Sequence, residues 1–136
     1  MTREQFIQRL LKVFNDDTGD VFSYGLEKGW LEFEDRLYRE DEITRKNIAR
    51  IIHMYLMKEK GIPDLQDISK AGEIRDLYDC RVCANHVAQI YLRGIMDAKE
   101  LSANGGFLWF DLNGEDDDSS IEDYLIRAYG ITKEIG

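Results

Sequence analysis

The chain has 136 residues, of which 43% are hydrophobic and 33% are charged, and its formal net charge is −9. This length and balance predict a single globular domain, 1–136, with a hydrophobic core of its own. The excess of acidic residues repels phosphate backbones and no basic stripe is visible, so we expect no nucleic-acid binding. No apolar run approaches the roughly 20 residues that a membrane helix needs, so we expect no membrane insertion.

The N-terminus begins directly with an amphipathic pattern. It shows no cationic segment followed by an apolar run, so no signal peptide is visible. Taken as written, the chain is predicted to be cytoplasmic. A cell-surface location would apply if a targeting segment is missing from it.

The first helix is predicted from a capping box formed by Thr2 and Gln5. Its apolar residues recur at helical spacing over 6–14, and the polar segment 15–19 breaks it. The sequence therefore begins with one amphipathic helix.

A second short helix is expected around Val21, Phe22 and Leu26, and Gly29 ends it. In residues 30–34, apolar and acidic side chains alternate. This alternation predicts a short extended segment.

Thr44 is the expected N-cap of the next helix. The apolar stripe of that helix consists of Ile48, Ile51, Ile52, Tyr55 and Leu56. It ends at 58–61, before Pro63, and residues 64–78 are expected to form a connection with one helical turn at 71–74.

The remaining pattern predicts a helix over 79–93, a turn at 103–106 and a short strand at 107–110. A second capping box, at Ser119 and Glu122, opens the last helix. The expected fold is therefore mainly α: about five helices with long loops, and short extended segments within those loops.

Residues 20–130 resemble the S-layer homology family, helical modules that anchor bacterial surface proteins to cell-wall polysaccharide. Segment 27–30 (EKGW) resembles the turn that ends the first helix of a repeat. Segment 42–45 (EITR) resembles the Thr-Arg opening of the second helix.

Parts of a second repeat are also similar to this family. They are 65–68 (LQDI), the helix and Gly-Ile-Met turn within 83–96, and the loop 110–114 (FDLNG). The resemblance thus implies two degenerate helix-loop-helix units, 1–62 with an extra N-terminal helix and 63–136.

The second unit departs from the family pattern. Asp117 to Ser120 replace the Thr-Arg opening, and Cys83 stands where the family prefers tryptophan. Wall-binding members usually assemble three repeats, whereas two are visible here. The pattern therefore indicates the scaffold more strongly than a working wall anchor.

The resemblance implies a non-catalytic module that binds an acidic cell-envelope glycan. Its ligand-binding residues would be Thr44 and Arg45, with Trp30 offering a flat face to a sugar ring. Free amides at a helix N-terminus favour an anion, and a guanidinium can hold a carboxylate with two hydrogen bonds. Alternatively, Arg45 pairs with a neighbouring acid in 40–42 and Trp30 belongs to the core.

A second hypothesis is a small acidic cytosolic protein that uses the same scaffold for protein–protein contact. It predicts a partner protein or a homodimer that binds exposed aromatic surface near Trp30 or Trp109.

The cysteines form a C-x-x-C pattern, Cys80 and Cys83, with His86 three residues further on. A structural zinc site needs four ligands, and His53 is far away in the sequence. A thioredoxin-like site needs a βαβ context that the pattern lacks. Ordinary buried or free thiols are expected, while metal binding and redox chemistry remain open.

The segment 111–122 has oxygen ligands at calcium-loop positions, but Asp116 and Asp118 replace the glycine and the apolar residue that such a loop needs. We expect a solvated acidic loop there. No nucleophile elbow or phosphate-binding glycine loop is present, so no enzyme activity and no cofactor are predicted. His53 and His86 are expected to be structural or surface residues.

Overall fold

The computed structural model describes residues 1–16, 19–101 and 106–135, and it confirms the mainly α fold. In the described residues there are six α-helices, two 3₁₀ helices and one two-stranded sheet. No helix in this part of the chain is both long enough and apolar enough to cross a membrane.

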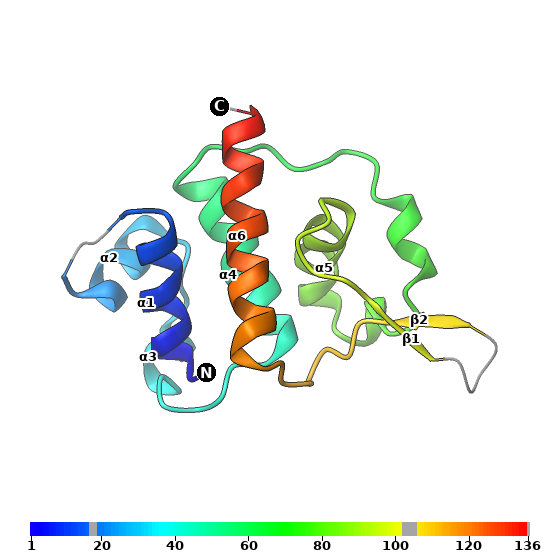
Figure 1. Ribbon diagram of the computed structural model, residues 1–136, viewed down its shortest axis with the longest axis horizontal. Coiled ribbons are helices and arrows are strands. Elements are labelled where there is room, and N and C mark those ends of the chain that lie inside the picture. Colours follow the sequence, from blue (N-terminus) through cyan, green and yellow to red (C-terminus); the bar gives the residue numbers. More distant parts are fainter. Residues whose placement is uncertain (17–18, 102–105, 136) are drawn as a thin grey trace.

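The helices form three groups along the long axis of the molecule (Figure 1). One end carries α1 (Arg3–Val13), α2 (Val21–Lys28) and α3 (Phe33–Leu37). The middle consists of α4 (Arg45–Lys58) and α6 (Asp118–Ile135). The other end carries α5 (Arg81–Leu92), β1 (Lys99–Leu101) and β2 (Phe107–Trp109).

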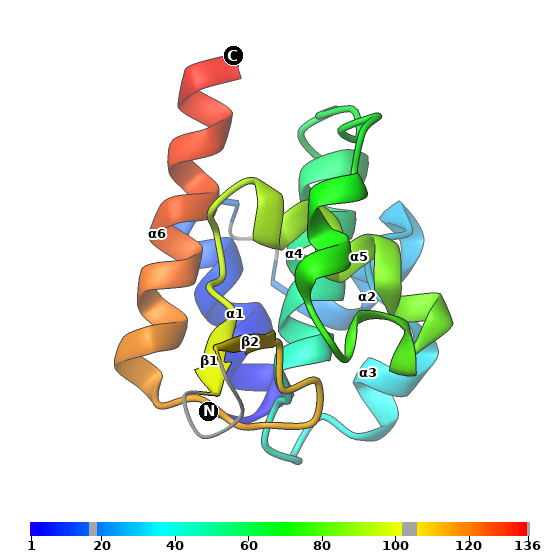
Figure 2. The same ribbon diagram turned by 90° about the vertical axis from the view of Figure 1, so that its right-hand side faces the viewer.

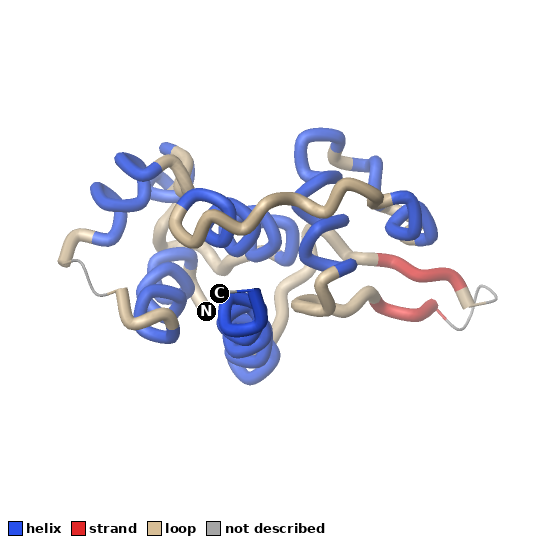
Figure 3. The backbone as a smooth tube through the Cα atoms, turned by 90° about the horizontal axis from the view of Figure 1, so that it is seen from above, coloured by secondary structure: helices blue, strands red, loops and turns tan. Residues whose placement is uncertain are grey.

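The view from above shows the two strands projecting at the end opposite α1 to α3 (Figure 3). They are antiparallel, with Lys99 opposite Trp109. The short strand expected at 107–110 is thus present as β2, while the turn expected at 103–106 lies almost wholly outside the described residues. Asp76 fixes the end of β2, because its carboxylate accepts the backbone N–H groups of Phe110 at 2.7 Å and of Asp111 at 2.9 Å.

A single hydrophobic core joins the two predicted units. α4 packs against α5 on one side and α6 on the other, and α1 also packs against α6 (Figure 2). Buried side chains from α1, α4, α5 and α6 belong to one cluster; they include Phe6, Leu10, Ile48, Ile52, Tyr55, Val87, Ile90, Ile121 and Leu125. Residues 1–62 and 63–136 therefore share their apolar interior.

Several helix ends match the sequence pattern. The capping box of α1 is present, with Gln5 N–H donating to Thr2 Oγ1 at 3.1 Å and Thr2 N–H donating to Gln5 Oε1 at 2.9 Å. Gly29 ends α2 in the left-handed region with a φ of 86°, as glycine does at little cost. The turn expected at 71–74 overlaps a 3₁₀ helix, η1 (Ser69–Glu73), and a second 3₁₀ helix, η2 (Leu77–Asp79), follows.

The extended segment expected at 30–34 is wrong, because α3 begins at Phe33. The Asp35 carboxylate accepts the Glu32 N–H at 2.8 Å, which closes the first turn. Asp35 itself is fully buried against arginines of other helices. A tertiary ion pair thus overrides the local alternation of apolar and acidic residues.

The cap predicted for the last helix is also wrong. α6 begins at Asp118, and the Asp117 carboxylate accepts the Ser120 N–H at 2.8 Å. This backbone hydrogen bond lowers the pKa of Asp117. Glu122 instead forms a bidentate salt bridge with Arg9 of α1, with N–O distances of 2.7 to 3.0 Å.

Two helical glycines give a matched test of the packing around α2. A Cβ at Gly25 would lie 2.4 Å from Leu31 Cδ1, whereas a Cβ at Gly130 in α6 meets nothing within 4 Å. We expect Gly25→Ala to lower the free energy of unfolding by about 1–3 kcal/mol through overpacking, and Gly130→Ala to raise it by up to about 1 kcal/mol. Urea denaturation at 25 °C measures both, and equal effects of the two substitutions would contradict the packing.

Candidate functional site

The N-terminus of α4 is buried against the loop that leads into α6. The backbone N–H groups of Arg45 and Lys46 donate to the carbonyls of Gly114 and Leu112, both at 2.9 Å. The first N–H groups of a helix have no hydrogen-bond partner within that helix. The amides that the sequence offered to an anion are therefore occupied by the chain itself.

The Arg45 side chain is 2% exposed and is surrounded by acceptors. Its Nε donates to Phe110 O at 2.7 Å, and its Nη2 donates to Asp97 O at 2.6 Å. Its Nη1 lies 2.5 Å from Asp116 Oδ2 and 3.0 Å from the Tyr124 hydroxyl. The guanidinium also lies 4.6 Å from the centre of the Phe110 ring.

The partner of Arg45 thus differs from the neighbouring acids in 40–42 that the sequence suggested. Asp116 lies 71 residues further along the chain and also accepts the Tyr124 hydroxyl at 2.6 Å. Burial and this carboxylate raise the pKa of Tyr124 to about 12, so the phenol stays protonated and neutral at ordinary pH.

Trp30 and Thr44 lie elsewhere. Trp30 is 1% exposed, as the core alternative predicted, and packs edge-to-face on Tyr55 with ring centres 5.0 Å apart. Tyr55 is ten residues beyond Arg45 on α4, roughly 15 Å along a helix axis. Thr44 occupies the N-cap position, but its hydroxyl accepts Asn47 Nδ2 at 3.0 Å instead of a backbone amide. The structure therefore does not bring the three predicted ligand residues together on a surface.

A row of polar side chains follows α4 at three-residue spacing: Thr44, Asn47, Arg50 and His53. We call this row the polar seam. Asn47, Arg50 and His53 are 7%, 7% and 5% exposed, so each needs a partner inside the protein. The three-residue spacing is the sequence signal that could have identified these residues, because i and i+3 lie on the same face of a helix.

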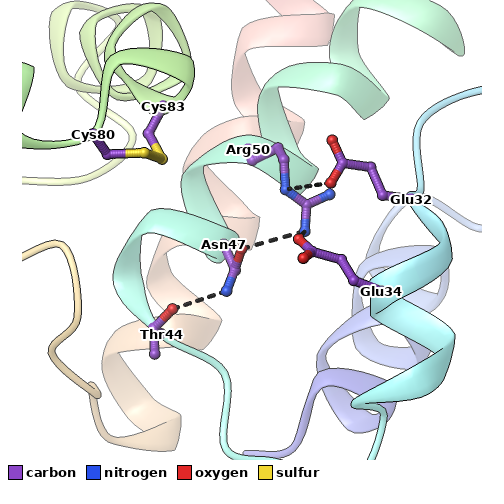
Figure 4. The surroundings of a disulfide bond; sticks show 7 residues. All are labelled: Glu32, Glu34, Thr44, Asn47, Arg50, Cys80 and Cys83. Carbon is purple, nitrogen blue, oxygen red and sulfur yellow. Dashed lines mark hydrogen bonds and ion pairs between the residues drawn. A yellow bond between two sulfur atoms is a disulfide. The ribbon is translucent and has the colours of Figure 1, made fainter.

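Arg50 of the polar seam holds α3 against α4. Its Nη1 and Nη2 donate to the two Asp35 oxygens at 3.0 and 2.6 Å, and Arg3 of α1 adds a contact of 2.9 Å to the same carboxylate. Glu32 and Glu34 flank the guanidinium (Figure 4). This cluster neutralises a fully buried carboxylate, so its primary role is structural.

His53 of the polar seam links two other ionisable groups. Its Nε2 lies 2.6 Å from Asp64 Oδ1, and its Nδ1 lies 2.7 Å from His86 Nδ1 on α5. Burial alone would raise the pKa of Asp64, but hydrogen bonds from His53 and Asn85 lower it overall. An ionised Asp64 can only accept, so the proton on this side belongs to His53 Nε2.

His86 stands at the end of this chain of three groups. Burial, followed by the neighbouring His53 and Arg50, lowers the pKa of His86 to about 4. His86 is therefore neutral at pH 7. No hydrogen bond to its Nε2 is present in the described part of the protein.

The two cysteines form a disulfide, which corrects the expectation of free thiols. Their spacing of three residues at the start of α5 brings the sulfurs together. Figure 4 places this disulfide beside Asn47 and Arg50 of the polar seam. Within the described residues, no three or more histidine, cysteine or acidic side chains form a group suited to a metal ion.

The acidic segment 111–122 divides its carboxylates among separate cations. Asp111 pairs with Lys99 at 2.8 Å, and Asp116 and Glu122 pair with arginines of α4 and α1. The carboxylates at its first, sixth and last positions therefore hold three different elements together.

Large apolar side chains are exposed at several places in the described residues, among them Phe107 of β2 and Ile126 of α6. Phe33 and Leu37 of α3, with Tyr38 directly after it, have exposures of 71%, 63% and 47%. Tyr78 and Val82 lie near the disulfide in the sequence, with exposures of 67% and 85%.

Comparisons with protein-family models, with curated proteins and with solved structures found no significant match for this chain.

Removal of the Arg45 side chain tests its structural role. We expect Arg45→Ala to lower the free energy of unfolding by about 3–5 kcal/mol, because Asp116 and two carbonyls lose a buried cation. The matched change Arg9→Ala breaks a pair at a partly exposed site and should cost less than about 1 kcal/mol. Chemical denaturation measures the loss in free energy of unfolding for both variants. A small loss for Arg45→Ala would contradict the structural role and leave Arg45 available to bind a ligand.

His86 should make stability depend on pH. Its folded pKa of about 4 lies below the usual 6.5, so between these values the unfolded chain binds a proton that the folded protein does not. Above pH 6.5 the titration of His86 does not reduce the free energy of unfolding. Below it, the free energy of unfolding decreases as the pH falls towards 4. The loss should be about 2 kcal/mol, allowing for partial contact of the ring with solvent.

Urea midpoints at pH 7.0 and 4.5 measure this effect. The difference between the two pH values should shrink in His86→Gln and stay unchanged in Val82→Ala, an exposed change on the same helix. An unchanged difference in His86→Gln would rule out this source of pH dependence.

Proposed function

We propose that this protein is a binding module that recognises a partner protein through the exposed side of α3. The observation that carries the proposal is the contact surface formed by Phe33, Leu37 and Tyr38 within six consecutive residues. Aromatic and large aliphatic side chains are frequent anchors in protein interfaces. We call this group the α3 surface.

Charge supports a particular kind of partner. Of the two acids of α3, Asp35 is buried, and the half-exposed Glu34 lies 3.6 Å from Arg50. Arg36 makes no ion pair among the described residues, and Arg39 reaches Glu4 only at 3.9 Å. Available cations beside apolar side chains favour a partner segment that presents apolar side chains and carboxylates.

The shape of the α3 surface supports the same partner. A hollow of about 560 Å³ is lined by Phe33, Leu37 and Tyr38, with Arg36 and Arg39 beside them and Glu40 and Asp41 at its edge. A hollow of this kind accepts an anchoring side chain, and the surrounding polar groups then set the orientation of the partner.

The acidic cell-envelope glycan stays a prediction of the resemblance at 27–30 and 42–45. Binding there would require Arg45 to exchange Asp116 for a ligand carboxylate. Co-sedimentation with purified acidic wall polysaccharide tests it, with Arg45→Lys as the variant that keeps the charge. Absence of binding by the wild type would remove this second candidate.

The α3 surface is tested by comparing two exposed helical residues. Leu37→Ser should reduce capture of the partner about tenfold, because an anchoring apolar side chain contributes on the order of 1–2 kcal/mol. Ile126→Ser on α6, where the residue is 56% exposed, should leave capture unchanged. Quantitative mass spectrometry of proteins retained from cell extract by each immobilised variant measures the effect.

Two further results decide the nature of the partner. Arg36→Glu should weaken retention of the same proteins and reduce its dependence on salt. A dimer in sedimentation analysis that Leu37→Ser dissociates would assign the α3 surface to a second copy of the chain. Identical retention and identical oligomeric state for the wild type and Leu37→Ser would overturn the proposal.

A further inference from the structure

The disulfide lies where a helix favours thiolate chemistry. Cys80 occupies the N-cap position of α5 and Cys83 lies in its first turn. Free amides at a helix N-terminus stabilise a thiolate, and the C-x-x-C spacing allows the two sulfurs to open and close without a change of fold. Both residues are only partly buried.

A pocket opens beside this disulfide. It has a volume of about 430 Å³ and is lined by Cys80, Lys46, Asp79 and Trp109, among others. Its volume lies within the range of small-molecule sites. Cys80 lines this pocket, whereas Cys83 is not among its lining residues, so Cys80 is the sulfur that a small reagent would reach first.

His86 follows Cys83 by three residues, so both residues lie on one face of α5. Its Nδ1 contacts His53, and burial lowers its pKa to about 4. A thiol has an ordinary pKa of about 8.5, so His86 is too weak a base to take its proton, and Cys83 loses its proton to solvent.

We propose that Cys80 and Cys83 form a redox-active dithiol that reduces low-molecular-weight disulfides bound in the pocket beside Cys80. The oxidised form of this pair is the disulfide of the present structure. The centre is separate from the α3 surface and adds a chemical activity to it.

The reaction balances in two exchanges. The Cys80 thiolate attacks one sulfur of the substrate disulfide, and the other substrate sulfur leaves as a thiolate. Cys83 then loses its proton to solvent and attacks Cys80 Sγ, which releases the second substrate sulfur as a thiolate. Two electrons pass from the dithiol to the substrate, and an external thiol returns the protein to its reduced form.

The test mixes the reduced protein with bis(2-hydroxyethyl) disulfide, followed by rapid alkylation and mass spectrometry. The wild type should pass through a mixed disulfide and reach the intramolecular disulfide. Cys83→Ser should stop at a stable mixed disulfide on Cys80, and Cys80→Ser should react at least tenfold more slowly. Equal reaction of both single-cysteine variants would contradict the assignment of Cys80.

The pH profile tests attack by thiolates. Closure of the disulfide should speed up as the pH rises towards the ordinary thiol pKa of about 8.5, because only the Cys83 thiolate attacks. Val82→Ala should match the wild type at each pH. A rate of closure that does not change with pH would contradict the mechanism.

Two other results would overturn the proposal. One is a disulfide that stays closed in 10 mM dithiothreitol at pH 8 in the folded protein. The other is reduced protein that retains one equivalent of zinc and loses thiol reactivity, because the cysteines and histidines would then serve as metal ligands.

Discussion

The buried guanidinium of Arg45 is the interaction on which the arrangement of the chain most depends. It joins the start of α4 to Asp97, Phe110 and Asp116, which belong to irregular segments far along the sequence. A buried guanidinium must find acceptors for its donors, and backbone carbonyls outside regular structure must find donors. The guanidinium donates hydrogen bonds that the carbonyls accept, so both find partners. The loop before α6 is therefore held on α4 although it contains no strand or helix.

The helices were predictable where apolar residues recur along one helix face. α1, α2 and α4 follow from apolar spacing and from Thr2, Gln5 and Gly29. α3 was not predictable because five residues are too short for a helical period, and a buried pair with Arg50 stabilises them. The start of α6 was missed because several acids and serines in succession could each cap it, and the choice depends on the contact of Glu122 with Arg9.

The candidate site was predictable only in part. The Thr-Arg pair singled out Arg45, but the sequence does not say whether its anion is a ligand or Asp116. The contact between His53 and His86 arises from the packing of α4 on α5, and 33 residues separate them. The C-x-x-C pattern gave the spacing of Cys80 and Cys83, whereas their position beside the polar seam is a property of the fold.

The two ends of the polar seam differ in chemistry. At the α3 end, Arg50 and Asp35 form a bidentate salt bridge, and a guanidinium does not exchange protons near neutral pH. At the α5 end, His53 and His86 share a hydrogen bond, and His86 stays neutral until the pH falls towards 4. A surface beside the first pair keeps its charge over a wide pH range, which suits binding. Cys83 of the disulfide lies one helical turn before His86 on α5. The seam therefore separates the proposed recognition at α3 from the proposed chemistry at α5 along one helix.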